Sequence, residues 1–148
     1  MYDIKESKVT VLDSNVFIKK WTPENVISNV PIILIHDSLG SVDLWKDFPL
    51  KLAQATARCV IAYDRLGFGK SDSCIEKPSI DFIKNEAEVF FPALKRQLSI
   101  DNYILLGHSV GGGMAINIAA KDKDCLAVIS ISAQAFVEEV TISGIQKA

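Results

Sequence analysis

The sequence predicts an α/β fold with a mainly parallel sheet, and three observations support this prediction. Four short apolar runs, rich in β-branched residues, are spread along the chain. Segments with helical patterns fill the gaps between them, and a strand–turn–strand pattern precedes the first run. Strands that alternate with helices are typical of an α/β domain.

The chain opens with a predicted β-hairpin. Residues 9–12 and 16–18 are β-prone and flank Asp13-Ser14-Asn15. Because Asp and Asn tolerate the dihedral angles of tight turns, we expect the turn at these three residues.

The four apolar runs are predicted to be buried strands, since none of them alternates cleanly between apolar and polar residues. Strands covered on both faces have this pattern, and they belong to parallel sheets flanked by helices. The runs are residues 32–35, 59–63, 103–106 and 126–131.

Three helices are predicted between these strands. The first covers residues 44–55, and the third covers 109–120. The second begins at Ser79 as N-cap, and Pro92 is expected to kink or break it. Its apolar residues recur at spacings of three and four, namely Ile80, Ile83, Ala87, Phe91, Leu94 and Leu98.

The clearest chemical pattern lies between strand 102–107 and helix 109–120. Gly107-His108-Ser109-Val110-Gly111 is a G-x-S-x-G sequence in a strand–turn–helix context. A serine at the top of such a turn has a strained backbone, and the residues two positions before and after it approach each other closely. Glycine avoids the clash. The pattern predicts a nucleophile elbow, with Ser109 as the nucleophile and Gly107 and Gly111 as the elbow glycines.

Two further segments follow predicted parallel strands. One is His36-Asp37-Ser38-Leu39-Gly40, and the other runs from Asp64 through Gly67 and Gly69 to Ser71. The carboxyl ends of strands form the ligand crevice of open α/β sheets, so we expect both segments to lie near Ser109.

Taken together, the three segments resemble the α/β-hydrolase fold family, in its group of small serine esterases and C–C bond hydrolases. That group has a His-Gly turn, an Asp-x-x-Gly-x-Gly-x-Ser loop and a nucleophile elbow in this order. The resemblance implies that residues 1–148 are one incomplete domain, the N-terminal part of such a fold. The lid and the C-terminal strands would then be absent.

The resemblance also implies roles for individual residues. Ser109 would form an acyl-enzyme with a carboxylic ester or a related acyl substrate. The backbone N–H groups of Ser38 and Val110 would form the oxyanion hole. Asp37 stands where the family has glycine, and its carboxylate would weaken the oxyanion hole if it pointed inward. A serine nucleophile argues against the dehalogenase and epoxide-hydrolase branches, which use Asp.

The base and the acid of a catalytic triad are not evident. In the family the base histidine follows the nucleophile, but the only histidines here are His36 and His108. We expect a structural role for His36 and a side chain turned away from the nucleophile for His108. Glu138 and Glu139 are interpreted as a solvated charged face. The chain alone is therefore expected to be an inactive fragment.

Composition limits the binding partners and the cellular compartment that we expect for this chain. A net charge of −2 gives no reason to propose nucleic acid or an anionic membrane as partner. Three cysteines without metal-like spacing favour a reducing, cytoplasmic setting, and neither a cofactor nor a metal is expected. No signal peptide is visible, and no apolar run approaches a membrane span. Strand 126–131 is expected to be an exposed edge that permits self-association or completion by a partner.

Two alternatives to the enzyme remain open. One is a non-catalytic α/β-hydrolase-like binding module that keeps the elbow as scaffold. The other is a nucleotide-binding domain with residues 107–113 as a phosphate loop, although this run lacks the Walker lysine and the dinucleotide fingerprint. Among enzymes, the sequence leaves esterase, lipase, thioesterase and C–C hydrolase open.

Overall fold

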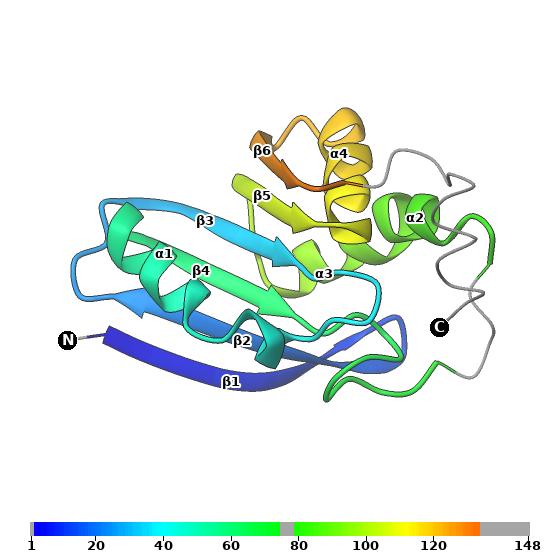
Figure 1. Ribbon diagram of the computed structural model, residues 1–148, viewed down its shortest axis with the longest axis horizontal. Coiled ribbons are helices and arrows are strands. Elements are labelled where there is room, and N and C mark those ends of the chain that lie inside the picture. The colour runs from blue at the N-terminus through cyan, green and yellow to red at the C-terminus, as the bar shows by residue number, and fades with distance from the viewer. Residues whose placement is uncertain (1, 75–78, 134–148) are drawn as a thin grey trace.

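A six-stranded mixed sheet forms the centre of the computed structural model, which describes residues 2–74 and 79–133 (Figure 1). The strand order is β1-β2-β4-β3-β5-β6. β3 pairs in parallel with β4 and β5, and β5 pairs in parallel with β6, whereas β2 is antiparallel to both β1 and β4. The predicted α/β fold is therefore confirmed. The strands are β1 (Tyr2–Val11), β2 (Ser14–Pro23), β3 (Ser28–Ile35), β4 (Arg58–Tyr63), β5 (Tyr103–His108) and β6 (Cys125–Ile131).

The N-terminal hairpin is longer than its β-prone core, and its turn lies one residue earlier than predicted. Val11 pairs with Ser14, which leaves Leu12 and Asp13 as a two-residue turn. Both have positive φ, 48° and 64°. Two-residue turns with positive φ at both positions match the twist of the flanking strands. Ser14 therefore lies in β2 and not in the turn.

The first helix begins later than predicted. A short 3₁₀ helix, Val42–Trp45, comes first, and α1 (Phe48–Thr56) follows. Lys46 separates them with φ 53°, a conformation that no helix continues through. Pro49 lies in the first turn of α1, where a missing N–H costs no hydrogen bond.

The second helical segment is divided, as Pro92 led us to expect. It consists of α2 (Phe82–Asn85), a π-helical turn (Glu86–Phe90) and α3 (Phe91–Gln97). A proline ring clashes with the carbonyl four residues earlier in an α-helix, and the wider π turn just before Pro92 relieves this clash.

Two details of that prediction were wrong, because the helix begins later than the pattern suggested. Ser79 is not the N-cap, although its Oγ accepts a hydrogen bond from the backbone N–H of Asp81. Ile80, expected on the apolar face, is 97% exposed.

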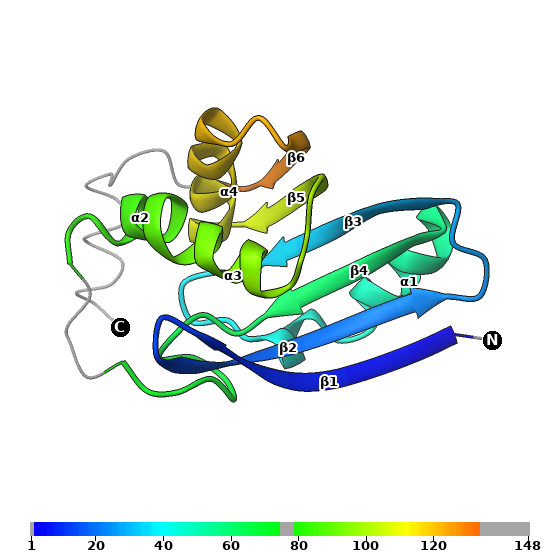
Figure 2. The ribbon, with the colours of Figure 1, turned by 180° about the vertical axis from the view of Figure 1, so that it is seen from behind.

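The helices cover both faces of the sheet. α1 packs on one face, and α2, α3 and α4 (Val110–Lys121) pack on the other (Figures 1 and 2). Neighbouring residues of β3 therefore enter different cores: Ile33 and Ile35 pack toward α3 and α4, whereas Ile32 and Leu34 pack toward α1. This two-sided burial explains why the apolar runs do not alternate.

β6 is the last strand of the described sheet, as predicted for an edge. Several of its apolar residues are exposed, and they are Leu126, Val128, Ile129 and Ile131. No helix among the described residues is long and apolar enough to cross a membrane.

Candidate active site

Ser109 connects β5 to α4 and has a strained backbone. Its φ and ψ are 54° and −121°, a combination that costs a non-glycine residue about 1–3 kcal/mol. Its N–H donates to the carbonyl of Ile131 at 2.9 Å, and its own carbonyl accepts from Gly112 at 2.9 Å. The side chain is half-buried. The strand and the helix thus hold Ser109 from both sides, at the end of the sheet where a nucleophile is expected.

The glycines on either side of Ser109 permit two backbone segments to touch. A Cβ added to Gly107 would lie 2.1 Å from the carbonyl oxygen of Gly111. A Cβ added to Gly111 would lie 2.2 Å from the carbonyl oxygen of Ile35 and 2.5 Å from that of His36. These contacts involve main-chain atoms that cannot rotate away, so both positions require glycine. They also place the start of α4 directly against the end of β3.

The turn after β3 lies beside the elbow. The parallel register pairs Ile35 with Gly107, so the residues that follow each strand emerge side by side. The Oδ2 atom of Asp37 lies 3.5 Å from Nδ1 of His108, and both side chains are partly exposed. The structure therefore brings Ser38, Ser109 and Val110 to the same edge of the sheet.

The backbone N–H groups of Ser38 and Val110 are the predicted oxyanion donors. Val110 is the first residue of α4, where a backbone N–H has no partner within the helix. Within the described ranges, neither N–H has a hydrogen-bond acceptor. Two such donors are the elements that an oxyanion hole requires.

His36 fixes the shape of the turn from inside the protein. It is almost fully buried, and its Nε2 accepts a hydrogen bond from the backbone N–H of Arg65 at 3.0 Å. Because that nitrogen accepts, the ring proton is on Nδ1, which donates to the Asp37 carbonyl at 2.8 Å. Burial, with a smaller effect of the Arg65 charge, lowers the pKa of His36 to about 4. His36 is therefore neutral at pH 7, and both of its nitrogens are occupied.

The loop after β4 is a scaffold for the site. The buried carboxylate of Asp64 accepts backbone N–H groups of Val42 at 2.6 Å and Lys70 at 2.8 Å. The backbone carbonyl of Asp64 accepts the Ser71 hydroxyl at 2.6 Å. Gly69 has a φ of 54° and approaches the Asp64 carboxylate so closely that a side chain would not fit. The Asp-x-x-Gly-x-Gly-x-Ser segment thus ties neighbouring loops together beside the site.

Arg65 is a site residue that the sequence analysis did not identify. It is 6% exposed, and its guanidinium donates to the Asp37 carbonyl oxygen at 2.6 Å. A buried pair lies near it, in which the Tyr63 hydroxyl donates to Glu86 at 2.5 Å. Burial raises the pKa of both Tyr63 and Glu86 and lowers that of Arg65. The only signal in the sequence was a charged residue two positions after a buried strand.

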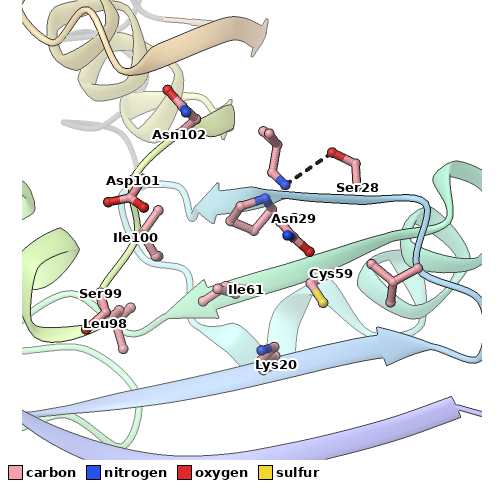
Figure 3. Close-up of a pocket in the computed structure, with 13 residues that line it drawn as sticks. Lys20, Ser28, Asn29, Cys59, Ile61, Leu98, Ser99, Ile100, Asp101 and Asn102 are labelled. Atoms are coloured by element: carbon pink, nitrogen blue, oxygen red, sulfur yellow. Dashed lines mark hydrogen bonds between the residues drawn. The ribbon is translucent and has the colours of Figure 1, made fainter.

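A described hollow lies elsewhere. A pocket of about 400 Å³ opens at the amino ends of β3 and β4, at the other end of the sheet from Ser109 (Figure 3). Ser28, Cys59 and Asp101 are among the residues that line it, and none of the predicted site residues does. In the described part of the chain, no three His, Cys, Asp or Glu side chains are grouped as a metal site would require. Glu138 and Glu139 lie outside the described residues.

Comparison with known proteins agrees with this geometry. The family model for the alpha/beta hydrolase fold matches residues 30–145. The chain is 30% identical over 121 residues to a 1-acylglycerol-3-phosphate O-acyltransferase, ABHD5, of Sus scrofa. That match covers 79% of this chain but only 33% of the pig protein, so the chain spans about a third of this relative.

Two solved structures show the same arrangement of strands and helices. Proline iminopeptidase from Mycobacterium smegmatis has 26% sequence identity and a TM-score of 0.74, over 88% of this chain and 44% of that chain. A membrane phospholipase A, described as a bacterial virulence factor, has 22% identity and a TM-score of 0.79. The match covers 98% of this chain and 46% of the phospholipase chain. At 22% identity it supports the fold alone.

Proposed function

Because the chain belongs to the alpha/beta hydrolase fold family, we propose that it carries the nucleophile and the oxyanion hole of a serine hydrolase. The substrate is a small carboxylic ester or a related acyl compound. The observation that carries this proposal is Ser109, held with φ 54° between β5 and α4 and beside two N–H groups without acceptors. The name of the pig relative, an O-acyltransferase, supports an acyl substrate.

In the proposed reaction, Ser109 Oγ attacks the acyl carbon of the substrate and transfers its proton to a base. The carbonyl oxygen becomes negative and is bound by the N–H groups of Ser38 and Val110. The bond to the leaving group then breaks, the base returns the proton to the departing oxygen, and water hydrolyses the acyl-enzyme. Losing one oxyanion donor typically costs about 3–4 kcal/mol, so the two N–H groups account for much of the catalysis.

The base in this proposal comes from outside residues 1–148. His36 is neutral and buried with both nitrogens hydrogen-bonded, so it is unable to accept the proton of Ser109. Nδ1 of His108 lies 3.5 Å from the Asp37 carboxylate on the neighbouring turn, and we expect its ring to be turned away from Ser109. No other histidine occurs in the sequence. In this proposal, residues 1–148 are one incomplete domain that lacks the base and does not turn over substrate by itself.

Hydrolysis of p-nitrophenyl esters of graded acyl length, by the full-length protein that contains this chain, tests the proposal. Ser109→Ala is expected to reduce kcat by about a thousandfold or more, as removal of a serine nucleophile does elsewhere. Ser99→Ala is the matched control, because Ser99 also has positive φ but is exposed and borders the pocket far from Ser109. Unchanged turnover in Ser109→Ala would contradict the proposal.

A non-catalytic binding module is the second candidate, and the Asp37 carboxylate beside the site favours it. A negative charge at this point opposes a developing oxyanion. This candidate predicts saturable binding of acyl compounds with no ester hydrolysis above that of Ser109→Ala. An activated phosphonate that labels Ser109 covalently would exclude it.

We also propose a cytoplasmic location and self-association through β6. The thiols of Cys59 and Cys125 are free, which suits a reducing compartment. The exposed apolar residues of β6 form an unpaired edge of the described sheet, and such edges pair with other chains. Sedimentation of the 148-residue chain is expected to show dimers or larger species. A monomer at all concentrations would contradict the association.

A further inference from the structure

Three hydrogen-bond donors converge on the carbonyl oxygen of Asp37. Arg65 Nη2 lies at 2.6 Å, His36 Nδ1 at 2.8 Å and the backbone nitrogen of Gly40 at 3.3 Å. A carbonyl oxygen has two lone pairs, so this one is fully used. The contact from Arg65 is the shortest, and it is charge-assisted.

This carbonyl belongs to the same peptide unit as the N–H of Ser38. The unit is planar, so a fixed oxygen also fixes the direction of the N–H on its other side. Hydrogen bonds in a chain polarise one another. Donors that draw electron density toward the Asp37 oxygen therefore make the Ser38 N–H a stronger donor. No acceptor within the described residues uses that N–H, so the effect is available to a ligand.

Arg65 is built into the turn and has no freedom to swing away. Its backbone N–H donates to Nε2 of His36 while its guanidinium binds Asp37, so one residue holds the turn at two points. The guanidinium also lies 4.4 Å from the ring centre of Phe68. With these contacts, Arg65 is only 6% exposed.

A contribution to folding stability does not by itself explain why Arg65 is buried here. A buried charge is costly unless it is fully paired, and within the described residues Arg65 Nε has no hydrogen-bond partner. The carboxyl group of the nearby Glu86 accepts a hydrogen bond from the Tyr63 hydroxyl. The incompletely paired guanidinium of Arg65 is held against the Asp37 carbonyl, which points to a role for Arg65 at that carbonyl.

We propose that Arg65 is a positioning residue for the oxyanion hole, which orients and polarises the Asp37–Ser38 peptide so that the Ser38 N–H binds the developing negative charge. This inference rests on the proposed function of Ser109 and Ser38. The residue acts through the peptide and does not touch the substrate.

Arg65→Met and Arg65→Lys test the proposal, with Arg58→Met as matched control. Arg58 also donates to a backbone carbonyl, that of Val30 at 3.1 Å, but at the amino end of the sheet. Two readouts are needed. One is kcat and KM for ester hydrolysis by the full-length protein. The other is the ¹⁵N chemical shift of the Ser38 amide in the 148-residue chain, which responds to hydrogen bonds on the preceding carbonyl and needs no activity.

Arg65→Met is expected to lower kcat by about 10- to 100-fold, less than the loss of an oxyanion donor outright, with KM within about twofold. Arg65→Lys keeps one charged donor and is expected to lie between Arg65→Met and the wild type in both readouts. Arg58→Met is expected to leave kcat and the Ser38 shift unchanged. If Arg65→Met does not fold, Arg65→Lys carries the test.

An equal loss of kcat in Arg58→Met, or wild-type kcat and an unmoved Ser38 shift in the Arg65 variants, would overturn the proposal. Failure of the proposed function has a different signature. Turnover would then not depend on Ser109, while the Ser38 shift would still respond to Arg65.

Discussion

The carboxylate of Asp37 and the imidazole of His108 face each other across the two halves of the candidate site. Oδ2 of Asp37 lies 3.5 Å from Nδ1 of His108, the residue directly before Ser109. Oδ1 of the same carboxylate accepts the backbone N–H of Leu39 at 3.2 Å. The carboxylate is therefore held between the turn after β3 and the residue that precedes Ser109.

Replacing Asp37 by Asn is expected to raise kcat/KM for ester hydrolysis. The amide keeps an acceptor for Leu39 but removes the charge that opposes the oxyanion. Two charges about 4 Å apart in water repel by about 1 kcal/mol, which corresponds to a rate gain of up to about fivefold. Asp43→Asn is the control, since Asp43 is an exposed carboxylate paired with Lys70 outside the site. Equal or lower turnover in Asp37→Asn would show that the carboxylate supports the site.

The stability of the fold is expected to fall as pH drops from 6.5 to about 4. Burial lowers the pKa of His36 from 6.5 to about 4, so in this window the unfolded chain binds a proton that the folded chain does not. A shift of this size amounts to about 3 kcal/mol.

Urea unfolding at several pH values between 7 and 4 measures this loss. His36→Asn removes the titrating ring, so its free energy of unfolding should change less steeply in the same window than that of the wild type. Carboxylates titrate alike in both proteins and cancel in the comparison. Parallel profiles would show that His36 is not responsible.

Alanine at either elbow glycine is expected to destabilise the protein by about 3 kcal/mol or more, because the new methyl group overlaps main-chain atoms. Gly113→Ala is the matched control. Gly113 lies in the same helix and is half-buried, and alanine in a helix interior is favoured over glycine by up to about 1 kcal/mol. Thermal unfolding separates the two cases. Similar losses at all three positions would indicate crowding of α4 in general.

Ser109→Gly is expected to be more stable than Ser109→Ala by about 1 kcal/mol. Glycine releases the strain at φ 54°, about 1–3 kcal/mol, but loses part of that gain to its greater unfolded-state entropy. Lys46 offers a matched site, since its φ and ψ of 53° and −121° are nearly those of Ser109. Lys46→Gly compared with Lys46→Ala should show the same difference in denaturant unfolding. A difference at Lys46 alone would mean that the elbow is not strained.

Most of the sheet was predictable because its residues obey local rules. Runs such as residues 32–35 are apolar on both sides, and helices cover both faces of the strand that they form. The start of the second helix was not predictable, because Ile80 fits the apolar spacing and yet lies outside the helix in solvent. Helix ends depend on caps and tertiary contacts that periodicity does not contain.

Some residues of the candidate site were likewise predictable from the sequence, and others were not. Ser109 and its flanking glycines form a local pattern, so they were found from neighbouring residues alone. Arg65 meets Asp37 only because the parallel register of β3 and β4 brings the ends of these strands together. Which carbonyl a long side chain reaches depends on packing, and a single sequence does not contain that information.

The direct contact between Gly111 and the end of β3 bears on how such proteins diverge. No side chain lies between these two segments, so the spacing between the start of α4 and the turn after β3 is set by the main chain. Side chains elsewhere are then free to change without moving the reacting groups apart. Over the 121 aligned residues this chain is 30% identical to the pig relative, and a spacing set by main-chain contact does not depend on the side chains that differ.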